Sequence, residues 1–160
     1  MALDPSELRR VMGHFATGVA VVTAMDMEAG RPYGLTANAV ASVSLEPPLV
    51  LACVEKGSDT HPRIRAAQGF AISVLAADQE ALAHRFAGLD AAEKFRDVAY
   101  RREVTGAPVL EGALAWVDCR LWAEYPGGDH TIFVGEVVAG GARAGEPLIF
   151  FRSGYGRFQP

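Results

Sequence analysis

The chain has 160 residues, half of them hydrophobic, and a formal net charge of −4 at neutral pH. This length fits one domain, expected over residues 1–160, and the apolar content excludes an intrinsically disordered chain. Acidic and basic residues are scattered without a Lys/Arg run, which argues against a nucleic-acid partner, and no apolar run reaches the roughly 18–20 residues that span a bilayer.

We expect a cytoplasmic protein. The first ten residues lack the apolar stretch of a signal peptide. Cys53 and Cys119 lie far apart without a CxxC motif, so we interpret them as buried, reduced thiols. The histidines show no metal-binding spacing, and we therefore expect no metal site.

The N-terminal segment predicts a helix. Asp4 is a suitable N-cap and Pro5 suits the first helical position. Apolar residues from Leu8 to Phe15 recur with helical spacing and define one face. Gly18 is expected to end this helix.

The period then changes to two. Residues 19–25, 33–44, 49–55 and 70–76 each predict one strand, with a short helix opening near Ser58, Asp59 or Thr60 between the third and the fourth. A helix capped by Asp78 and ended by Gly88 follows, and residues 90–95 predict a turn or short helix.

The C-terminal half continues with strands. Residues 113–125 alternate, which places Trp116 and Trp122 on one face, where we expect them to pack a barrel wall or a dimer interface. Residues 130–142 and 146–158 supply two more strands. About seven strands with helices around them indicate a mainly β fold, a small barrel with peripheral helices.

The segment EYPGGDHTIFVGEV raises a question of function. Residues 126–129 predict a tight turn between two strands, and His130 stands where the second strand begins. The chain has no GxGxxG motif, Walker loop or GxSxG motif. Spacing alone therefore indicates only a β-rich barrel, in which His130 contacts a ligand or is a solvated hairpin residue.

Two further segments suit a ligand. The strand at residues 36–44 is rich in small and polar residues, which let backbone approach a flat ligand, although a tightly packed edge strand would look the same. The loop at residues 56–61 offers hydroxyls and backbone amides at a helix start, which suits a phosphate, although ordinary capping explains it equally.

Taken in order, the segments FATGVAVVT, GLTANAVASVSLEPPLVLACV, LAHRFAG, GDH, VGEV and YGRF resemble the short-chain flavin reductase family. The resemblance runs from about Val11 to Phe158. Members of this family are NAD(P)H:flavin oxidoreductases that supply reduced flavin to two-component monooxygenases. The resemblance therefore implies NAD(P)H-dependent reduction of FMN or FAD, with NADH or NADPH as the hydride donor and a monooxygenase as the partner.

The resemblance also implies a fold and an assembly. The expected fold is a split β-barrel, Greek-key-like and of the FMN-binding type, usually a homodimer with the flavin near the interface. A single small barrel offers little surface to enclose a flavin, which also favours a dimer.

Site residues are carried over position by position. Phe86 and Ala87 are expected to close over the ring, while Ala37 and Ala39 stand where relatives often carry Ser or Thr, so backbone contacts are expected there. His61 is added because a charged imidazole suits a phosphate, with a surface position beside Pro62 as the equal alternative. The expected flavin-binding residues are Thr36, Ala37, Asn38, Ala39, Ser42, Cys53, Val54, Ser58, Thr60, His61, Phe86 and Ala87.

His130 and Tyr155 are expected to face the nicotinamide nucleotide. Because hydride passes between two cofactors, the protein needs no acid or nucleophile, and His130 is the one candidate for a catalytic contact. The alternatives are a non-catalytic flavin- or haem-binding split-barrel carrier, a pyridoxamine-phosphate-oxidase-like enzyme, and a barrel without a ligand.

Overall fold

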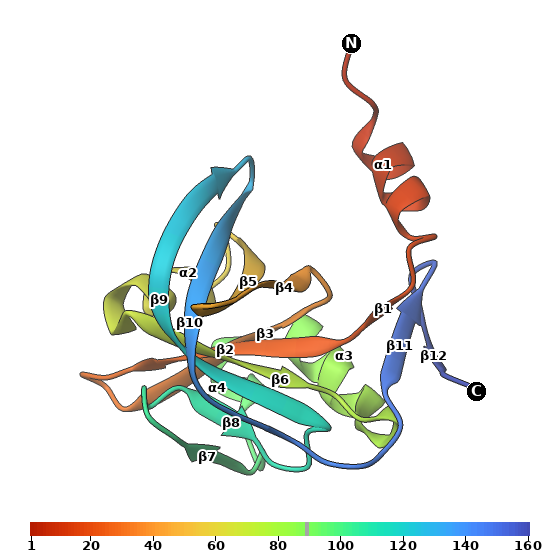
Figure 1. The fold of residues 1–160 in the computed structure, drawn as a ribbon. Coiled ribbons are helices and arrows are strands. Elements are labelled where there is room, and N and C mark those ends of the chain that lie inside the picture. The colour runs from red at the N-terminus through yellow and green to blue at the C-terminus, as the bar shows by residue number, and fades with distance from the viewer. Residues whose placement is uncertain (89) are drawn as a thin grey trace.

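The computed structural model describes residues 1–88 and 90–160. Its centre is a seven-stranded antiparallel sheet with the strand order β3-β2-β6-β9-β10-β5-β4 (Figure 1). The seven strands are β2 Ala20–Asp26, β3 Arg31–Ala37, β4 Val40–Leu45, β5 Pro48–Glu55, β6 Gly69–Val74, β9 Ala115–Gly127 and β10 His130–Ala142.

The sheet curls until its two edges meet. Strands β3 and β4 end the strand order on opposite sides, yet only Asn38 and Ala39 separate them in the sequence. This short link holds the two edges together, and the Cys53 backbone N–H donates to the Ala39 carbonyl oxygen at 2.9 Å. The predicted split β-barrel is confirmed.

Two smaller sheets and the helices surround the barrel. Strands β1 Thr17–Gly18, β11 Leu148–Phe151 and β12 Gly154–Arg157 form one sheet, and β7 Tyr100–Arg102 pairs with β8 Pro108–Leu110. The helices are α1 Pro5–Met12, α2 Thr60–Ala67, α3 Glu80–Gly88, which follows a 3-10 turn at Ala77–Gln79, and α4 Ala91–Lys94. Within residues 1–88 and 90–160, no helix is long and apolar enough to cross a membrane.

Strand β2 separates two hydrophobic clusters. Val22 faces the barrel interior and packs with Phe70 and Phe133. Val21 points to the opposite face, where it packs with Leu75 and with Phe86 of α3. Successive side chains of a strand point to opposite faces, so a strand covered on both faces must be apolar throughout, which explains the run VAVVTAM.

Helix α1 begins as predicted but ends earlier. The Asp4 carboxylate accepts a hydrogen bond from the Ser6 backbone N–H at 2.8 Å. The helix stops at Met12 with Gly13 as its C-cap, so the prediction that Gly18 ends it is wrong. Gly18 instead belongs to β1, where it pairs with Ile149 of β11.

Four other predictions about elements are wrong. The strand expected at 33–44 is two strands on opposite edges, and the strand expected at 146–158 is a hairpin that turns at Arg152 and Ser153, both with positive φ. Asp78 lies inside the 3-10 turn, and the side-chain oxygen of Gln79 accepts from the Ala76 backbone N–H at 2.9 Å instead. The described residues form twelve strands rather than about seven.

The alternation expected for residues 113–125 also breaks. Trp122 has no partner in the β9–β10 register, where Leu121 pairs with Gly135 and Ala123 pairs with Val134. Trp122 is largely exposed, whereas Trp116 is half-buried with the Arg101 guanidinium 4.8 Å from its ring. The two tryptophans therefore have different surroundings.

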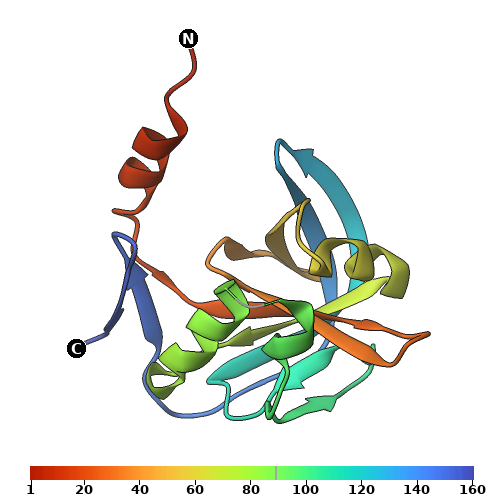
Figure 2. The same cartoon turned by 180° about the vertical axis from the view of Figure 1, so that it is seen from behind.

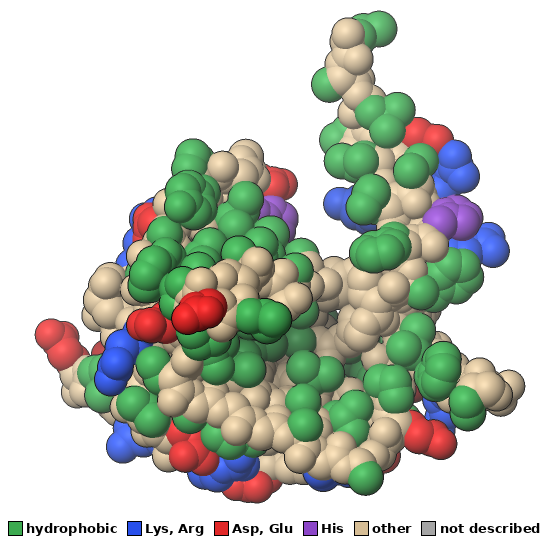
Figure 3. All heavy atoms as spheres, in the orientation of Figure 1, with side chains coloured by type: hydrophobic (Ala, Val, Ile, Leu, Met, Phe, Trp, Pro, Cys, Tyr) green, Lys and Arg blue, Asp and Glu red, His purple; other side chains and the backbone are tan. Residues whose placement is uncertain are grey.

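Helix α1 stands away from the barrel in both cartoon views (Figures 1 and 2). Its expected apolar face is uncovered, with Leu8, Val11, Met12 and Phe15 between 47% and 71% exposed. The space-filling view shows hydrophobic side chains of α1 lining a wide gap between this helix and the barrel (Figure 3).

Candidate functional site

A cavity of about 200 Å³ lies where the end of β3 meets α3 and the β11–β12 hairpin. It brings together four predicted flavin residues and Tyr155, which was predicted for the nicotinamide. Val19 and Phe150 also line it and were missed, since an apolar residue in a strand carries no signal of ligand contact. The complete lining is Val19, Thr36, Ala37, Asn38, Ala87, Phe150 and Tyr155.

The β3 wall of this cavity is held by helix α3. The Thr36 hydroxyl donates to the Ala83 carbonyl oxygen at 2.6 Å. That hydroxyl is therefore engaged within the protein, and Asn38, whose side chain is exposed, is the polar side chain of this wall open to a ligand. The wall otherwise consists of backbone and small side chains, which allow a flat molecule to lie close.

The opposite wall is aromatic. The Tyr155 ring lies 5.5 Å from the Phe150 ring and edge-on to the His84 ring, with 4.9 Å between centroids. Burial, with a smaller contribution from the Glu80 carboxylate, raises the pKa of Tyr155 above its ordinary value. Tyr155 is thus a neutral phenol at physiological pH, able to donate a hydrogen bond.

A second group of predicted residues lies at the end of β5 and the start of α2. The Ser58 hydroxyl donates to the Glu55 carbonyl oxygen at 2.9 Å and accepts from the His61 backbone N–H at 3.2 Å. Val54 and Thr60 are buried, and burial raises the pKa of the half-buried Cys53 thiol. The side chain of Asp59, the N-cap residue of α2, makes no capping hydrogen bond, and the Ser58 hydroxyl takes up the His61 backbone N–H of the first turn instead.

His61 does not lie on the loop surface. Its Nε2 is 2.7 Å from the Thr131 hydroxyl, and its ring packs against Phe133 at 5.2 Å between centroids. Burial is the main cause that lowers the pKa of His61 below its ordinary value. A buried, neutral ring lacks the charge on which its predicted phosphate contact depended.

Phe86 also differs from expectation. Its ring is fully buried and stacks edge-on against Phe95 at 4.9 Å between centroids. A Cβ added to Gly34 would lie 3.0 Å from this ring, so Phe86 fills the space beneath β3. The Phe86 side chain therefore supports the cavity from below, and only Ala87 of the predicted pair lines it.

The predicted turn before His130 is confirmed. His130 pairs with Gly127 across a two-residue loop, and Gly128 has a φ of 70°, which favours glycine. His130 Nδ1 lies 2.6 Å from a carboxylate oxygen of Asp129, and this hydrogen bond is the main cause that lowers the pKa of Asp129.

One copy of the chain does not unite all predicted residues. Figures 1 and 2 show the β9–β10 turn, which carries His130, far from β12, which carries Tyr155. Ser42 lies exposed on β4, where it pairs with Val50 of β5. The cavity at β3 and the β9–β10 turn are thus separate parts of the surface.

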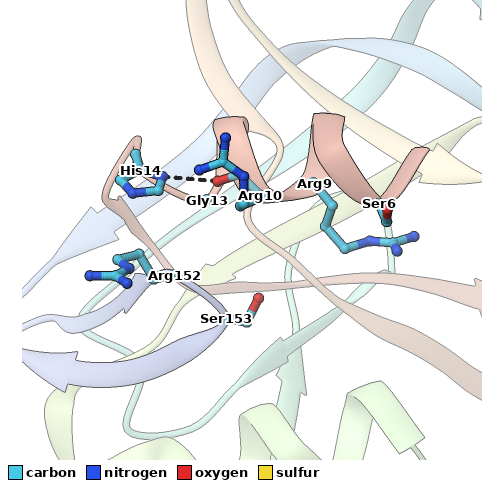
Figure 4. A pocket seen from close by; sticks show the side chains of 7 residues that line it. All are labelled: Ser6, Arg9, Arg10, Gly13, His14, Arg152 and Ser153. Carbon is cyan, nitrogen blue, oxygen red and sulfur yellow. Dashed lines mark hydrogen bonds between the residues drawn. The ribbon is translucent and has the colours of Figure 1, made fainter. Parts of the chain in front are cut away.

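A larger hollow lies elsewhere, between α1 and the β11–β12 turn, and measures about 430 Å³ (Figure 4). Arg10 is paired with Glu7 at 2.6 Å. Figure 4 shows the Arg9 and Arg152 side chains pointing to different sides, so its positive charges do not converge on one point. As far as the chain is described, its lining includes none of the predicted site residues, and we place the candidate site in the cavity at β3.

Residues 1–88 and 90–160 hold no group of three His, Cys, Asp or Glu side chains arranged to bind a metal ion.

Comparisons with known proteins identify the family of this chain. The flavin reductase like domain family matches residues 12–159. The chain is 46% identical over 158 residues to the reductase component of a 4-nitrophenol 4-monooxygenase/4-nitrocatechol 2-monooxygenase from Rhodococcus opacus, covering 99% of this chain and 83% of that protein. It is 47% identical over 150 residues to the FMN reductase (NADH) SmoA of Agrobacterium fabrum, covering 94% and 84%.

A solved structure is similarly close. The NADH:FAD oxidoreductase SgcE6 of Streptomyces globisporus, in complex with NAD and FAD fragments, superposes with a TM-score of 0.90 at 43% identity. The superposition covers 100% of this chain and 98% of that chain.

Proposed function

This chain belongs to the flavin reductase-like domain family, and from that premise we propose that it catalyses the NADH-dependent reduction of FMN or FAD and releases reduced flavin to a partner monooxygenase. The observation that carries the proposal is the cavity at β3, where Thr36–Asn38, Ala87 and Tyr155 meet. The relatives named above as an FMN reductase and as a monooxygenase reductase component supply the reaction class.

The cavity fits a flavin ring. One wall is backbone and small side chains, the other is aromatic, and the polar side chains of Asn38 and Tyr155 lie at its border. Sites for small molecules are mostly apolar with a few placed polar groups. A planar isoalloxazine ring with a polar pyrimidine edge matches that distribution.

The chemistry itself belongs to the two nucleotides: a hydride, carrying two electrons, passes from nicotinamide C4 to flavin N5, so that NADH becomes NAD⁺. The protein positions the ring. Thr36 is fixed by its bond to Ala83, and Tyr155 is held between His84 and Phe150. This rigid support brings the reacting atoms together without a protein acid or nucleophile.

The protein acts as a homodimer in this proposal. An isolated helix of eight residues is marginal in water, so α1 with its exposed apolar face needs a partner surface. The barrel exposes a second apolar set on β4 and β9, at Val43, Leu45, Trp122 and Tyr125. In a dimer with two-fold symmetry, the apolar face of α1 in each copy packs against the β4 and β9 residues of the other copy, so this contact forms twice. The same arrangement allows His130 of one copy to approach the cavity of the other.

The site of action is the cytoplasm in this proposal. Cys53 and Cys119 are free thiols in the structure, as suits a reducing compartment. Cys119 is buried, and burial raises its pKa to about 12, which keeps the thiol protonated and unreactive.

The test follows NADH loss at the nicotinamide absorption band with and without FMN. Ala87→Trp fills the cavity and is expected to lower flavin-dependent NADH loss at least tenfold. Ala81→Trp, the same change at an exposed position of α3 outside the cavity, is the matched control and is expected to keep wild-type activity.

Each result has a distinct meaning. NADH loss that saturates with free flavin and disappears in Ala87→Trp supports the proposal. Flavin binding without NADH loss would favour the non-catalytic carrier. Activity that survives in Ala87→Trp would move the site away from β3.

A further inference from the structure

The turn of the β11–β12 hairpin carries an arginine that no carboxylate of the described chain neutralises. Arg152 and Ser153 form this turn beside the hollow under α1 (Figure 4), and their φ angles of 51° and 65° are uncommon outside glycine. The Arg152 backbone N–H donates to the Gly13 carbonyl oxygen at 2.8 Å, which ties the turn to the end of α1. Within residues 1–88 and 90–160 no carboxylate forms a salt bridge with Arg152. Its guanidinium is thus presented from a fixed backbone and is open to an anion.

This turn lies close to the candidate site. Tyr155, which lines the cavity at β3, follows Arg152 by three residues on the same hairpin. Three residues of a strand span about 10 Å, and β12 is paired with β11 from Gly154 to Arg157. A segment that reaches Tyr155 from outside this copy therefore has the Arg152 guanidinium within reach.

The turn between β9 and β10 carries the complementary charge. The Asp129 side chain is 89% exposed, and one of its carboxylate oxygens lies 2.6 Å from His130 Nδ1. A carboxylate has two oxygens, so the other can accept a further hydrogen bond. The nearby Lys56 Nζ donates to the Gly128 carbonyl oxygen instead. This turn therefore presents a carboxylate that is already bonded to an imidazole and can still accept a hydrogen bond from an arginine.

Within one copy of the chain the two turns do not meet, because the β9–β10 turn lies far from β12 (Figures 1 and 2). In the homodimer of the proposed function, His130 of one copy approaches the cavity of the other, where Tyr155 stands. Asp129 precedes His130 and is bonded to it, so the same approach brings its carboxylate to the β11–β12 turn. The exposed residues Trp122 and Tyr125, which that dimer buries, belong to the strand that leads into the β9–β10 turn. The contact between the two turns thus continues the apolar interface.

We propose that the Asp129 carboxylate of one copy forms an ion pair with the Arg152 guanidinium of the other, and that this pair positions His130 at the nicotinamide. The inference rests on the proposed function, because it requires the homodimer and a nicotinamide in the cavity at β3. The guanidinium holds the carboxylate, and the carboxylate orients the imidazole through Nδ1, which leaves Nε2 free to contact the nicotinamide. Arg152 and Asp129 are positioning residues and take no part in hydride transfer. Two-fold symmetry forms the pair twice in each dimer.

The first test exchanges the two charges. Arg152→Glu and Asp129→Lys each place like charges opposite one another at both contacts, and each is expected to raise the dissociation constant of the dimer at least tenfold. The variant that carries both substitutions restores two opposite pairs and is expected to return to within threefold of the wild-type constant. Sedimentation velocity over a dilution series measures these constants.

The control reverses a charge elsewhere on the surface. Arg102 is an exposed arginine of β7, away from the β11–β12 turn (Figure 1). Arg102→Glu is expected to keep the wild-type dimer, and its combination with Asp129→Lys is expected to remain as weak as Asp129→Lys alone.

The second test measures the positioning of His130. Arg152→Gln removes the charge without adding repulsion, and it is expected to raise KM for NADH about fivefold while kcat stays within twofold. Arg152→Lys keeps the charge and is expected to retain most of the wild-type KM. Both are assayed with saturating FMN, at protein concentrations where sedimentation shows a dimer.

The outcomes separate this inference from the proposed function. A wild-type protein without flavin-dependent NADH loss overturns both. An active wild-type dimer whose charge-exchanged variant stays as weak as the two single variants overturns the ion pair and leaves the proposed reaction standing. An unchanged KM for NADH in Arg152→Gln overturns the positioning of His130. Thermal unfolding of the single variants near the wild-type temperature excludes a folding defect as the cause of a weaker dimer.

Discussion

The barrel buries its apolar side chains, whereas the N-terminal helix of this chain exposes them. In β2 the residues from Ala20 to Met25 are all buried, whereas every residue of α1 is exposed or half-buried. The barrel strands cover one another because the curled sheet closes on itself. Helix α1 has a well-formed cap and a regular apolar face, but its own barrel does not cover that face. The difference indicates that the barrel is complete in one copy, while α1 is built to pack against another surface.

The largest effect is expected for an added methyl group inside the barrel. A Cβ at Gly135 would lie 2.6 Å from the Cys119 Cβ and 2.7 Å from the Phe70 ring. Gly135→Ala is therefore expected to lower the free energy of unfolding by about 3 kcal/mol, the upper range for overpacking. Denaturant titration measures the loss.

The matched control is Gly156→Ala in β12, outside the barrel. An added Cβ there meets open space among the described residues, and the expected change is within about 0.5 kcal/mol. Equal losses for the two variants would contradict the idea that the barrel is packed and the β11–β12 region is open.

An intermediate effect is expected for the apolar face of α1. Leu8→Gln keeps a good helix former but removes an apolar side chain worth about 2 kcal/mol when buried. Because each copy of a dimer contributes one helix, the dimer is expected to dissociate at a concentration at least tenfold higher, with the barrel still folded. Sedimentation velocity over a dilution series measures this shift.

Arg9→Gln on the same helix is the control for Leu8→Gln and is expected to leave the dimer intact. A wild-type protein that sediments as a monomer at micromolar concentration would remove the basis for the two-copy arrangement. Leu8→Gln dimers as tight as wild type would instead place α1 outside the interface.

The smallest effect concerns pH and His61. Burial lowers the pKa of His61 below its ordinary value of 6.5. The unfolded chain therefore takes up this proton at a higher pH than the folded protein does. The stabilisation is fully present above pH 6.5 and is lost as the pH falls through the folded pKa.

His61→Asn is expected to flatten the pH dependence of unfolding between neutral pH and about pH 5. Urea titrations at several pH values measure the slope. His14→Asn, on the exposed segment that follows α1, is the control and is expected to keep the wild-type slope. A slope unchanged by His61→Asn would mean that other groups govern acid unfolding.

The sequence predicts structural features correctly where they depend on residues a few positions apart. The cap at Asp4 and the turn at Gly128 depend on neighbours in the chain, and both are present. The run at residues 19–25 predicts a buried strand whatever its partners are. The family motifs likewise indicated Thr36–Asn38, Ala87 and Tyr155, which the structure gathers around one cavity.

Other features depend on which segments meet. The split of residues 33–44 at Asn38 follows from closure of the sheet, since β3 pairs with β2 and β4 pairs with β5. Phe86 belongs to the family segment HRFAG, whose Ala87 lines the cavity. The Phe86 ring nevertheless points into the core, because helix α3 turns this side chain toward Gly34 of β3. The contact of Lys94 with β3 carried no signal in the sequence, because only the packing of α4 on β3 brings its ammonium group to the Gly34 carbonyl oxygen.

By itself, the sequence determined the buried strand at residues 19–25, the helix cap at Asp4, the tight turn before His130 and the family to which the chain belongs. Each of these depends on residue type and on spacing along the chain. The tertiary structure alone decided which face of each element is covered, that the His61 ring is buried against Phe133, and that the Lys94 ammonium group meets the Gly34 carbonyl oxygen of β3. Burial and neighbouring charge are set by contacts between segments distant in sequence, and residue spacing does not record them.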